Sequence, residues 1–201
     1  MGREAAKRCG KLFPVALRAL FLACLSAGVA LAGCGGGTPA RSALSAPAEQ
    51  AQLRGSPPAL AALHLQADHL LSGGPAGFAA RLRALRGHPV VVNKWASWCG
   101  PCQSEFPAFQ RVSAGLGRQV AFLGLDGKDQ PAAAAAFLAR LPVSYPSYSD
   151  PDEAIARSIQ AVTFYPQTIY FNAAGRQVYV HAGPYLTAAA LMRDIRFYAL
   201  R

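Results

Sequence analysis

The chain has few cysteines, and their placement excludes several common uses of this residue. Only five occur among 201 residues, and no second closely spaced pair accompanies Cys99 and Cys102. A structural zinc site needs four ligands, which this pair cannot supply. The four histidines show no ligand spacing and lie at His64, His69, His88 and His181. We therefore expect no metal site. Cys9 and Cys24 lie in an N-terminal segment predicted below to be removed, and Cys34 is predicted to carry lipid. Only Cys99 and Cys102 then remain as thiols, so we expect no framework of disulfides.

Acidic residues are also scarce. The chain has 20 lysines and arginines against 10 aspartates and glutamates, a formal net charge of +10. An excess of positive charge is compatible with nucleic-acid binding, but no nucleic-acid recognition motif accompanies it. We expect no nucleic-acid partner. A solvated basic surface facing an anionic membrane accounts for the charge.

The chain lacks an apolar run long enough to cross a membrane. Its longest run, "ALFLACLSAGVALAG" at 19–33, follows a basic start, whereas a spanning helix needs roughly 20 apolar residues. The run ends in Leu31-Ala32-Gly33-Cys34, which resembles a bacterial lipobox. Residues 1–33 are predicted to be a signal peptide cut before Cys34, which then carries lipid. The chain would be anchored on the extracytoplasmic face of the cell membrane. An ordinary cleaved signal and an uncleaved anchor remain alternatives.

The next segment has no hydrophobic period. Residues 34–58 are rich in Gly, Ser, Pro and Ala, which predicts a flexible tether. From residue 59 the pattern becomes globular and continues to residue 201 without an internal repeat. We expect one domain there, acting as a monomer.

The domain alternates between strand and helix signals. Short β-branched or apolar runs predict strands at 89–95 and 119–126, and helical periodicity is present at 78–86 and 102–117. A strand, helix, strand order demands a parallel pair with a right-handed crossover. Two further runs, 167–171 and 177–181, flank Asn172–Gly175 as a hairpin. The fold class is therefore α/β: a mixed sheet built from a βαβ unit, a hairpin and a covering helix, with helices on both faces.

Three helix starts carry capping signals. Asp129 is predicted to cap a helix that has Pro131 in its first turn and runs to Leu141. Asp150 and Glu153 have the spacing of a capping box before a short helix. Thr187 is predicted to cap the final helix.

The two cysteines stand where a buried strand meets a helix. Cys99 would lie at the helix N-terminus, where free amide groups and the helix dipole favour a thiolate. Cys102, one turn later, would be less exposed and able to resolve a mixed disulfide. A structural disulfide across a two-residue gap would restrain little of the chain. The spacing therefore favours a redox-active pair.

The stretch "VVVNKWASWCGPC" resembles the thioredoxin-like superfamily, and the secretory context resembles its membrane-anchored extracytoplasmic TlpA/ResA branch. The resemblance covers roughly residues 60–200. It implies a thioredoxin-like fold and a thiol–disulfide oxidoreductase with Cys99 as nucleophile and Cys102 as resolving thiol. Pro107 matches a helix-kinking proline, and Pro166 matches the family's cis-proline. The residues expected to line the substrate-docking surface are Trp98, Gly100, Pro101, Tyr165 and Pro166.

Glu105 lies three residues after Cys102, on the same side of the helix. The resemblance implies that Glu105 accepts the proton of the buried thiol, and the alternative is an ordinary solvated glutamate. Asn93 stands where cytoplasmic thioredoxins carry a buried aspartate. Lys94 departs from the family, which has an apolar residue there. Its amine must reach water or an anion, and Glu105 is one candidate.

The resemblance also implies the partners. These would be proteins that bear cysteine pairs, with apocytochromes in cytochrome c maturation among them, and a membrane electron donor if the chain works as a reductant. No organic cofactor is needed beyond the Cys99–Cys102 disulfide. The direction of electron flow stays open. The alternatives are a non-catalytic lipoprotein that binds a ligand or copper through its thiols, and a thiol peroxidase, which the absence of a peroxidatic motif disfavours.

Overall fold

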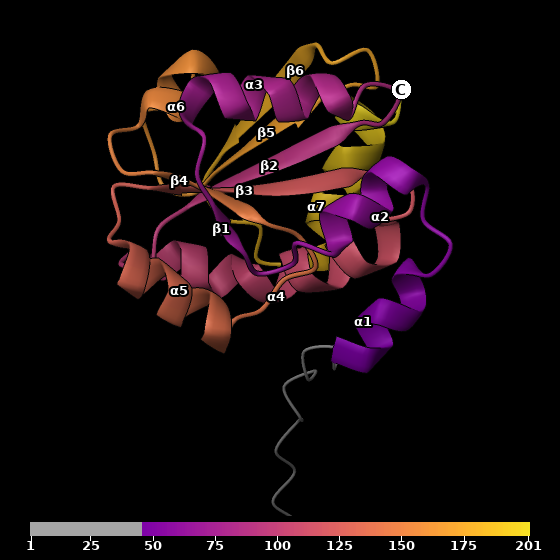
Figure 1. Ribbon diagram of the computed structural model, residues 1–201, viewed down its shortest axis with the longest axis horizontal. Helices are drawn as coiled ribbons and strands as arrows, with labels where there is room; N and C mark the ends of the chain where they lie inside the picture. Colours follow the sequence, from indigo (N-terminus) through magenta and orange to yellow (C-terminus); the bar gives the residue numbers. More distant parts are fainter. Residues whose placement is uncertain (1–45) are drawn as a thin grey trace, which may run out of the picture. The chain divides into compact units, whose positions relative to one another are not determined.

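The computed structural model describes residues 46–201, so the predicted signal peptide, Cys34 and the start of the tether lie outside the described residues. The described chain forms a six-stranded sheet in the order β1-β4-β3-β2-β5-β6 (Figure 1). The strands are β1 (Leu70–Leu71), β2 (Val90–Trp95), β3 (Ala121–Gly127), β4 (Ser147–Asp150), β5 (Gln167–Phe171) and β6 (Gln177–Ala182). Strands β1 to β4 pair in parallel, whereas β5 is antiparallel to both of its neighbours, β2 and β6. The predicted mixed sheet is confirmed.

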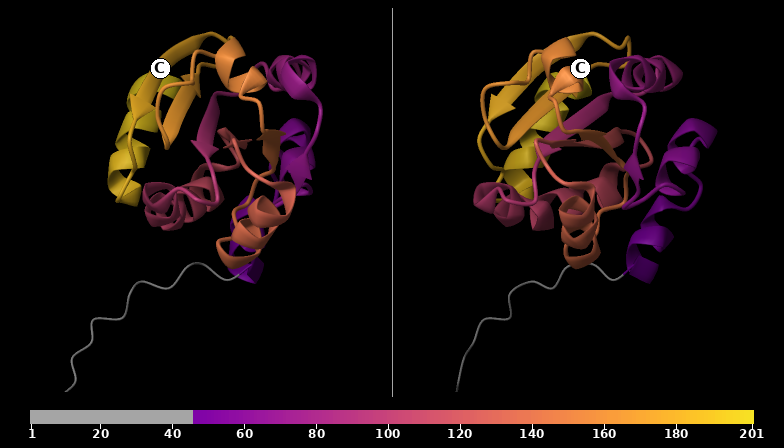
Figure 2. Two further views of the ribbon diagram at one scale, coloured as in Figure 1. Left: turned by 90° about the vertical axis from the view of Figure 1, so that its left-hand side faces the viewer. Right: turned by 60° about the vertical axis from the view of Figure 1, so that its left-hand side comes forward.

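Helices cover both faces of this sheet, as Figures 1 and 2 show. They are α1 (Ala46–Leu53), α2 (Pro58–His64), α3 (Gly74–Ala84), α4 (Gly100–Leu116), α5 (Pro131–Arg140), α6 (Ala154–Ser158), α7 (Ala188–Asp194) and the π-helical turn η1 (Ile195–Ala199). From α3 onward the predicted helices and strands occur in the predicted order, with the short strand β4 added between α5 and α6. Strands β1 and β4 were not predicted, because two and four residues are too few to establish a period.

The tether prediction is wrong for residues 46–53, which form α1. Pro47 lies in the first turn of this segment, where a proline is tolerated, and its alanine, glutamate, glutamine and leucine residues all favour a helix. Helix α1 lies against α4. The described domain therefore starts before the predicted boundary at residue 59.

Alternation along β2 divides the core into two layers. Val91 and Trp95 pack with residues of α4, α5 and α7, whereas Val90 and Val92 pack with residues of α2, α3 and α6. Successive side chains of a strand point to opposite faces, so each layer draws on every second residue. Asn93 and Lys94, the two polar residues of this buried strand, therefore face opposite layers.

Two of the three capping predictions need correction. Thr187 caps α7 as predicted, since its Oγ1 accepts from the Ala190 amide. Asp129 does not cap α5, which begins after Gln130 without a side-chain cap; its carboxylate accepts instead from the Ser97 amide and hydroxyl. Asp150 does accept from amides of α6, those of Ile155 and Ala156. Glu153 does not complete the capping box, because its carboxylate bonds elsewhere.

Gly124 in β3 is required by close packing. A Cβ there would clash with the Ser147 hydroxyl and lie 2.8 Å from Ser147 Cβ and 2.9 Å from Trp95 Nε1. Those two side chains share a hydrogen bond. We expect Gly124→Ala to lower the free energy of unfolding by about 2 kcal/mol, a typical cost of overpacking a core, as measured by denaturant unfolding.

Gly115→Ala is the matched control, because nothing lies within 4 Å of a Cβ at Gly115 in α4. Alanine there is expected to leave stability unchanged or raise it by up to about 1 kcal/mol. Equal stability for the two variants would contradict the packing argument.

Candidate active site

Cys99 and Cys102 form a disulfide at the N-terminus of α4. Cys99 is the N-cap residue, and its sulfur accepts from the Cys102 amide at 3.1 Å. Gly100 and Pro101 occupy the exposed first turn, where proline's missing N–H leaves no hydrogen bond unmade. Cys99 is 4% exposed and Cys102 is fully buried. The predicted order of the two sulfurs, an outer Cys99 and an inner Cys102, is thus confirmed.

The connection from β2 to α4 is held from a neighbouring loop. Asp129, after β3, accepts two hydrogen bonds from Ser97, one from its amide and one from its hydroxyl at 2.9 Å. Gln103 in α4 donates to the Ser97 carbonyl. Ser97 is thereby fixed two residues before Cys99, which sets where α4 begins. The sequence predicted Asp129 as a helix cap, and the tertiary structure shows that it binds Ser97 instead of capping α5.

Glu105 is fully buried in α4, so its interpretation as a solvated residue is wrong. Asn93 Nδ2 donates to Oε1 at 2.7 Å, and the Tyr185 amide donates to Oε2 at 3.1 Å. Burial raises the pKa of Glu105 from 4.5 to about 8, although both hydrogen bonds oppose the shift. A carboxyl group with such a pKa can accept and release a proton near neutral pH. Tyr185, eighty residues away, gave no signal in the sequence.

An exposed aromatic side chain directly precedes Cys99 in the chain, and another lies two residues before Pro166. Trp98 is 57% exposed and Phe164 is 56% exposed. The ring centroids of Trp98 and Tyr165 lie 5.0 Å apart, and Tyr165 precedes Pro166 in a cis peptide bond, as the sequence predicted. Trp95 lies in the core, again as predicted. The exposure of Phe164 was not predicted, because an apolar residue just before a strand is usually expected to be buried.

Lys94 does not pair with Glu105. Its buried amine lies 2.8 Å from Glu153 Oε1 and 3.9 Å from the centre of the Tyr165 ring. Alternation along β2 gives the reason, because Asn93 already points to the layer that holds Glu105. Glu153 was missed as a site residue because its spacing from Asp150 fitted a capping box.

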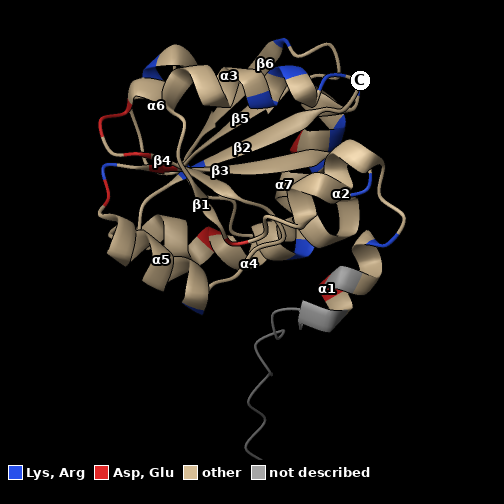
Figure 3. Cartoon of the chain, in the orientation of Figure 1, with Lys and Arg blue, Asp and Glu red and all other residues tan. Residues whose placement is uncertain are grey.

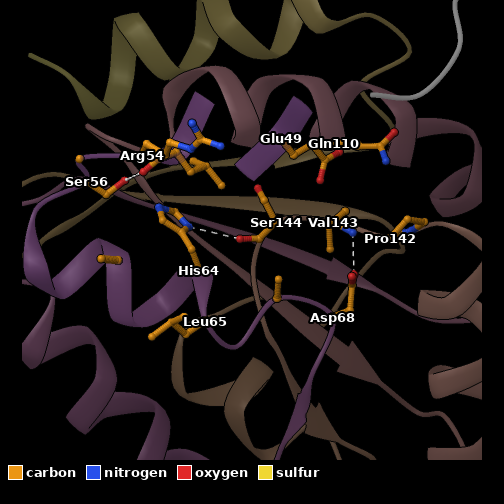
Figure 4. A pocket seen from close by; sticks show the side chains of 14 residues that line it. Glu49, Arg54, Ser56, His64, Leu65, Asp68, Gln110, Pro142, Val143 and Ser144 are labelled. Atoms are coloured by element: carbon orange, nitrogen blue, oxygen red, sulfur yellow. Dashed lines mark hydrogen bonds between the residues drawn. The ribbon is translucent and has the colours of Figure 1, made fainter. Parts of the chain in front are cut away.

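A cavity of about 610 Å³ lies away from the disulfide (Figure 4). Glu49 of α1, His64 of α2 and Asp68 line it together with Ser144 and other residues of the loop after α5, and neither cysteine contributes. It is therefore not part of the candidate active site. Within residues 46–201 no group of three or more His, Cys, Asp or Glu side chains could hold a metal ion, and no helix is long and apolar enough to span a membrane.

A Cys-x-x-Cys disulfide at a helix N-terminus after β2, together with a cis-proline just before β5, the strand that pairs with β2 in a mixed sheet, defines a thioredoxin-like fold. The sequence profile of the AhpC/TSA family matches residues 71–180, more than half of the chain, and the chain belongs to this family.

The proteins similar to this chain include thiol:disulfide interchange proteins. The thiol:disulfide interchange protein DsbE homolog of Paracoccus denitrificans is 36% identical over 101 residues, which cover 47% of this chain and 50% of that protein. Thiol:disulfide interchange protein DsbE of Pseudomonas fluorescens biotype C is 33% identical over 92 residues, covering 45% and 49%. The chain thus spans about half the length of these relatives. The structure of DsbF from Mycobacterium tuberculosis, in mixed oxidised and reduced forms, matches with a TM-score of 0.53 and 29% identity, covering 57% of this chain and 84% of that one.

Proposed function

We propose that this protein is a thiol–disulfide oxidoreductase that exchanges disulfides with protein substrates on the extracytoplasmic side of a bacterial membrane. One observation carries the proposal: the Cys99–Cys102 disulfide caps α4, with the outer sulfur at the helix N-terminus and the inner sulfur buried. The names of the relatives, thiol:disulfide interchange proteins, support the same activity.

The exchange takes two steps. In the reduced protein the Cys99 thiolate attacks one sulfur of a substrate disulfide, forms a mixed disulfide and releases the other substrate sulfur as a thiolate. The Cys102 thiolate then attacks Cys99 Sγ, which closes the Cys99–Cys102 disulfide and releases the second substrate thiolate. Two electrons pass from the pair to the substrate, and the reverse sequence oxidises a substrate dithiol. The reduction potential of the pair measures which direction is favoured.

Glu105 is the proposed proton acceptor for the inner thiol. Cys102 attacks only as a thiolate, and its burial raises the free energy of forming that charge. Glu105 is three residues further along α4, equally buried, and has a pKa of about 8, so its ionised form, which becomes populated as the pH approaches 8, is basic enough to take up this proton. Asn93 and the Tyr185 amide hold both carboxylate oxygens in place. No metal or organic cofactor enters the proposed reaction.

The proposed partners follow from the resemblance. They are proteins with cysteine pairs, apocytochromes among them, and a membrane electron donor if the protein works as a reductant. The exposed Trp98, Gly100 and Pro101 would form the docking surface together with the more buried Tyr165–Pro166 segment, whose Tyr165 backbone would pair with an extended substrate segment. The chain would act as a monomer.

We also propose that Cys34 carries the membrane anchor. The support is the apolar run at 19–33 that ends in Leu-Ala-Gly before this cysteine. When the full-length chain is expressed in bacteria fed a labelled fatty acid, the label is expected on the wild-type protein and not on Cys34→Ser. Cys24→Ser, inside the apolar run, serves as the control and should keep the label. Equal labelling of wild type and Cys34→Ser would contradict lipid attachment at this position.

An insulin-reduction assay tests the proposed activity. With dithiothreitol as electron source, the protein is expected to accelerate the reduction of insulin disulfides well above the rate with dithiothreitol alone. The alternative, a lipoprotein that binds a ligand or copper through its thiols, predicts no acceleration. The effect of removing each thiol is considered in the Discussion.

A further inference from the structure

Glu153 joins three elements beside the disulfide through a single carboxylate. Its Oε1 accepts from Lys94 Nζ at 2.8 Å and from the Tyr165 hydroxyl at 2.8 Å, while Oε2 pairs with Lys128 Nζ at 2.7 Å. Its side chain is 8% exposed. The three partners come from β2, from the loop after β3 and from the loop before β5. Glu153 therefore links three segments that are distant from one another in the sequence.

Two of these partners, Lys128 and Tyr165, connect Glu153 to residues beside the disulfide. The Lys128 carbonyl accepts from Trp98 Nε1 at 2.9 Å, next to Cys99. Tyr165 packs against Trp98 and immediately precedes Pro166. The Glu153 carboxylate thus contacts Tyr165 directly and is linked to the Trp98 side chain through Lys128.

The backbone conformation, the packing and the charges around Glu153 all favour these contacts. Glu153 has a φ of 53°, in the left-handed region that a glutamate rarely adopts, and this conformation places its side chain toward the sheet instead of along α6. At Gly127 a Cβ would clash with the Tyr165 hydroxyl and lie 3.2 Å from the ring carbon that bears it. Burial raises the pKa of Glu153, but hydrogen bonds from Lys128, Lys94 and Tyr165 outweigh it and hold the pKa at about 2.

Lys94 is the least expected member of the group. An ammonium group without exposed surface in a central strand is costly unless it is paired and hydrogen-bonded. Here it meets the Glu153 carboxylate and the face of the Tyr165 ring, 3.9 Å from its centre. Acidic residues gather at this edge of the sheet, where β3 and β4 end (Figure 3).

We propose that Glu153 is a positioning residue that holds Trp98 and Tyr165 in one arrangement, and so favours disulfides of polypeptide substrates over small disulfides. The inference rests on the proposed function. A small disulfide needs access only to the Cys99 sulfur, whereas a polypeptide also lies against Trp98 and the Tyr165–Pro166 segment. Ordering these two side chains in advance removes an entropic cost of docking that only the polypeptide substrate would meet.

The test compares two variants that leave no buried unpaired ammonium. Lys94→Met keeps Glu153 bound to Tyr165 and Lys128, and is expected to change the KM for insulin by less than about twofold. Lys94→Met/Glu153→Ala removes the whole group and is expected to raise this KM about tenfold, the effect of losing one or two ordered side chains. The rate with the small disulfide 5,5′-dithiobis(2-nitrobenzoate) should stay within about twofold for both.

The controls separate positioning from folding and from charge. In the Lys94→Met background, Asp152→Ala removes one negative charge, as Glu153→Ala does there, but at an exposed side chain one residue away, and it should leave the KM for insulin unchanged. Glu153→Gln, which keeps the side-chain shape, replaces the double variant if that variant does not fold, and should also raise the KM for insulin selectively.

Two results would overturn the inference. One is a KM for insulin that does not change when Glu153 is replaced. The other is an equal loss of rate with insulin and with the small disulfide, which indicates a general defect of the fold. A wild-type protein that reacts with neither substrate would instead contradict the proposed function itself, and this inference with it.

Discussion

Replacing Cys99 with serine is expected to reduce catalysed insulin reduction on the order of 10³-fold or more, to the rate with dithiothreitol alone. The reason is that Cys99 is the outer sulfur of the pair, at the N-terminus of α4, whereas Cys102 is fully buried. Loss of the nucleophile removes the first bond-forming step, and such losses are among the largest that single substitutions cause. The turbidity of reduced insulin measures the rate.

Cys102→Ser is the matched variant, and its behaviour should differ in kind. Cys99 can still attack a substrate disulfide, but no internal thiol remains to resolve the product. The protein should therefore accumulate as a mixed disulfide, seen as a shifted band without reductant and confirmed by its mass. If the adduct forms with Cys99→Ser instead, the two roles are reversed. If neither variant loses activity, the pair is not the catalyst.

Glu105→Gln is expected to change both the stability and the pH profile of exchange. The folded-state pKa of about 8 lies above the ordinary value of 4.5, mainly because of burial. Between these pH values the unfolded chain has released a proton that the folded protein keeps. The free energy of unfolding therefore falls as the pH rises from about 4.5 to about 8, by on the order of 4 kcal/mol from this residue.

The glutamine variant lacks this titration, so its stability should depend less on pH. Denaturant unfolding at pH 5 and pH 9 measures the difference. At pH 5 the variant should be less stable by about 1 kcal/mol, because its amide nitrogen faces a donor, either Asn93 Nδ2 or the Tyr185 amide. At pH 9 it should be the more stable protein. A pH dependence identical to the wild type would contradict the raised pKa.

The catalytic consequence of Glu105→Gln needs its own control. Cys99 should remain open to alkylation, while the pH dependence of disulfide exchange shifts because Cys102 has lost its proton acceptor. Asp126→Asn is the matched control. Burial and the nearby Asp129 raise the pKa of Asp126 to about 8 as well, so this variant should also flatten the stability profile. It should leave the pH profile of exchange unchanged, and an equal shift for both variants would remove Glu105 from the mechanism.

The local pattern was sufficient to predict the elements that carry the chemistry. The run "PVVVNKW" predicted β2, and the Cys-x-x-Cys at its end predicted a helix N-terminus, both of which the structure has. These signals are short-range: β-branched residues favour a strand, and a proline in the first turn favours a helix start. The same holds for the Thr187 cap and for the hairpin around Asn172–Gly175.

Elsewhere short-range signals were misleading or absent. The Asp150–Glu153 spacing fits a capping box in any isolated helix, yet Glu153 bonds Lys94, which lies fifty-nine residues away. Glu49 and its neighbours looked like a tether because a short helix with few large apolar residues gains its stability from packing, here against α4. Strand β1 is only two residues long and depends on β4 for its pairing.

The sequence by itself determined which atoms can react: two thiols, one turn apart, at the start of a helix that follows a buried strand. It also determined that an acid would lie on the same side of that helix. Only the tertiary structure decided the environment of those atoms, because burial and ion pairing depend on residues distant along the chain. Thus Glu105 has a raised pKa because α4 packs on the sheet, and Lys94 pairs with Glu153 because β2 turns it to the opposite face.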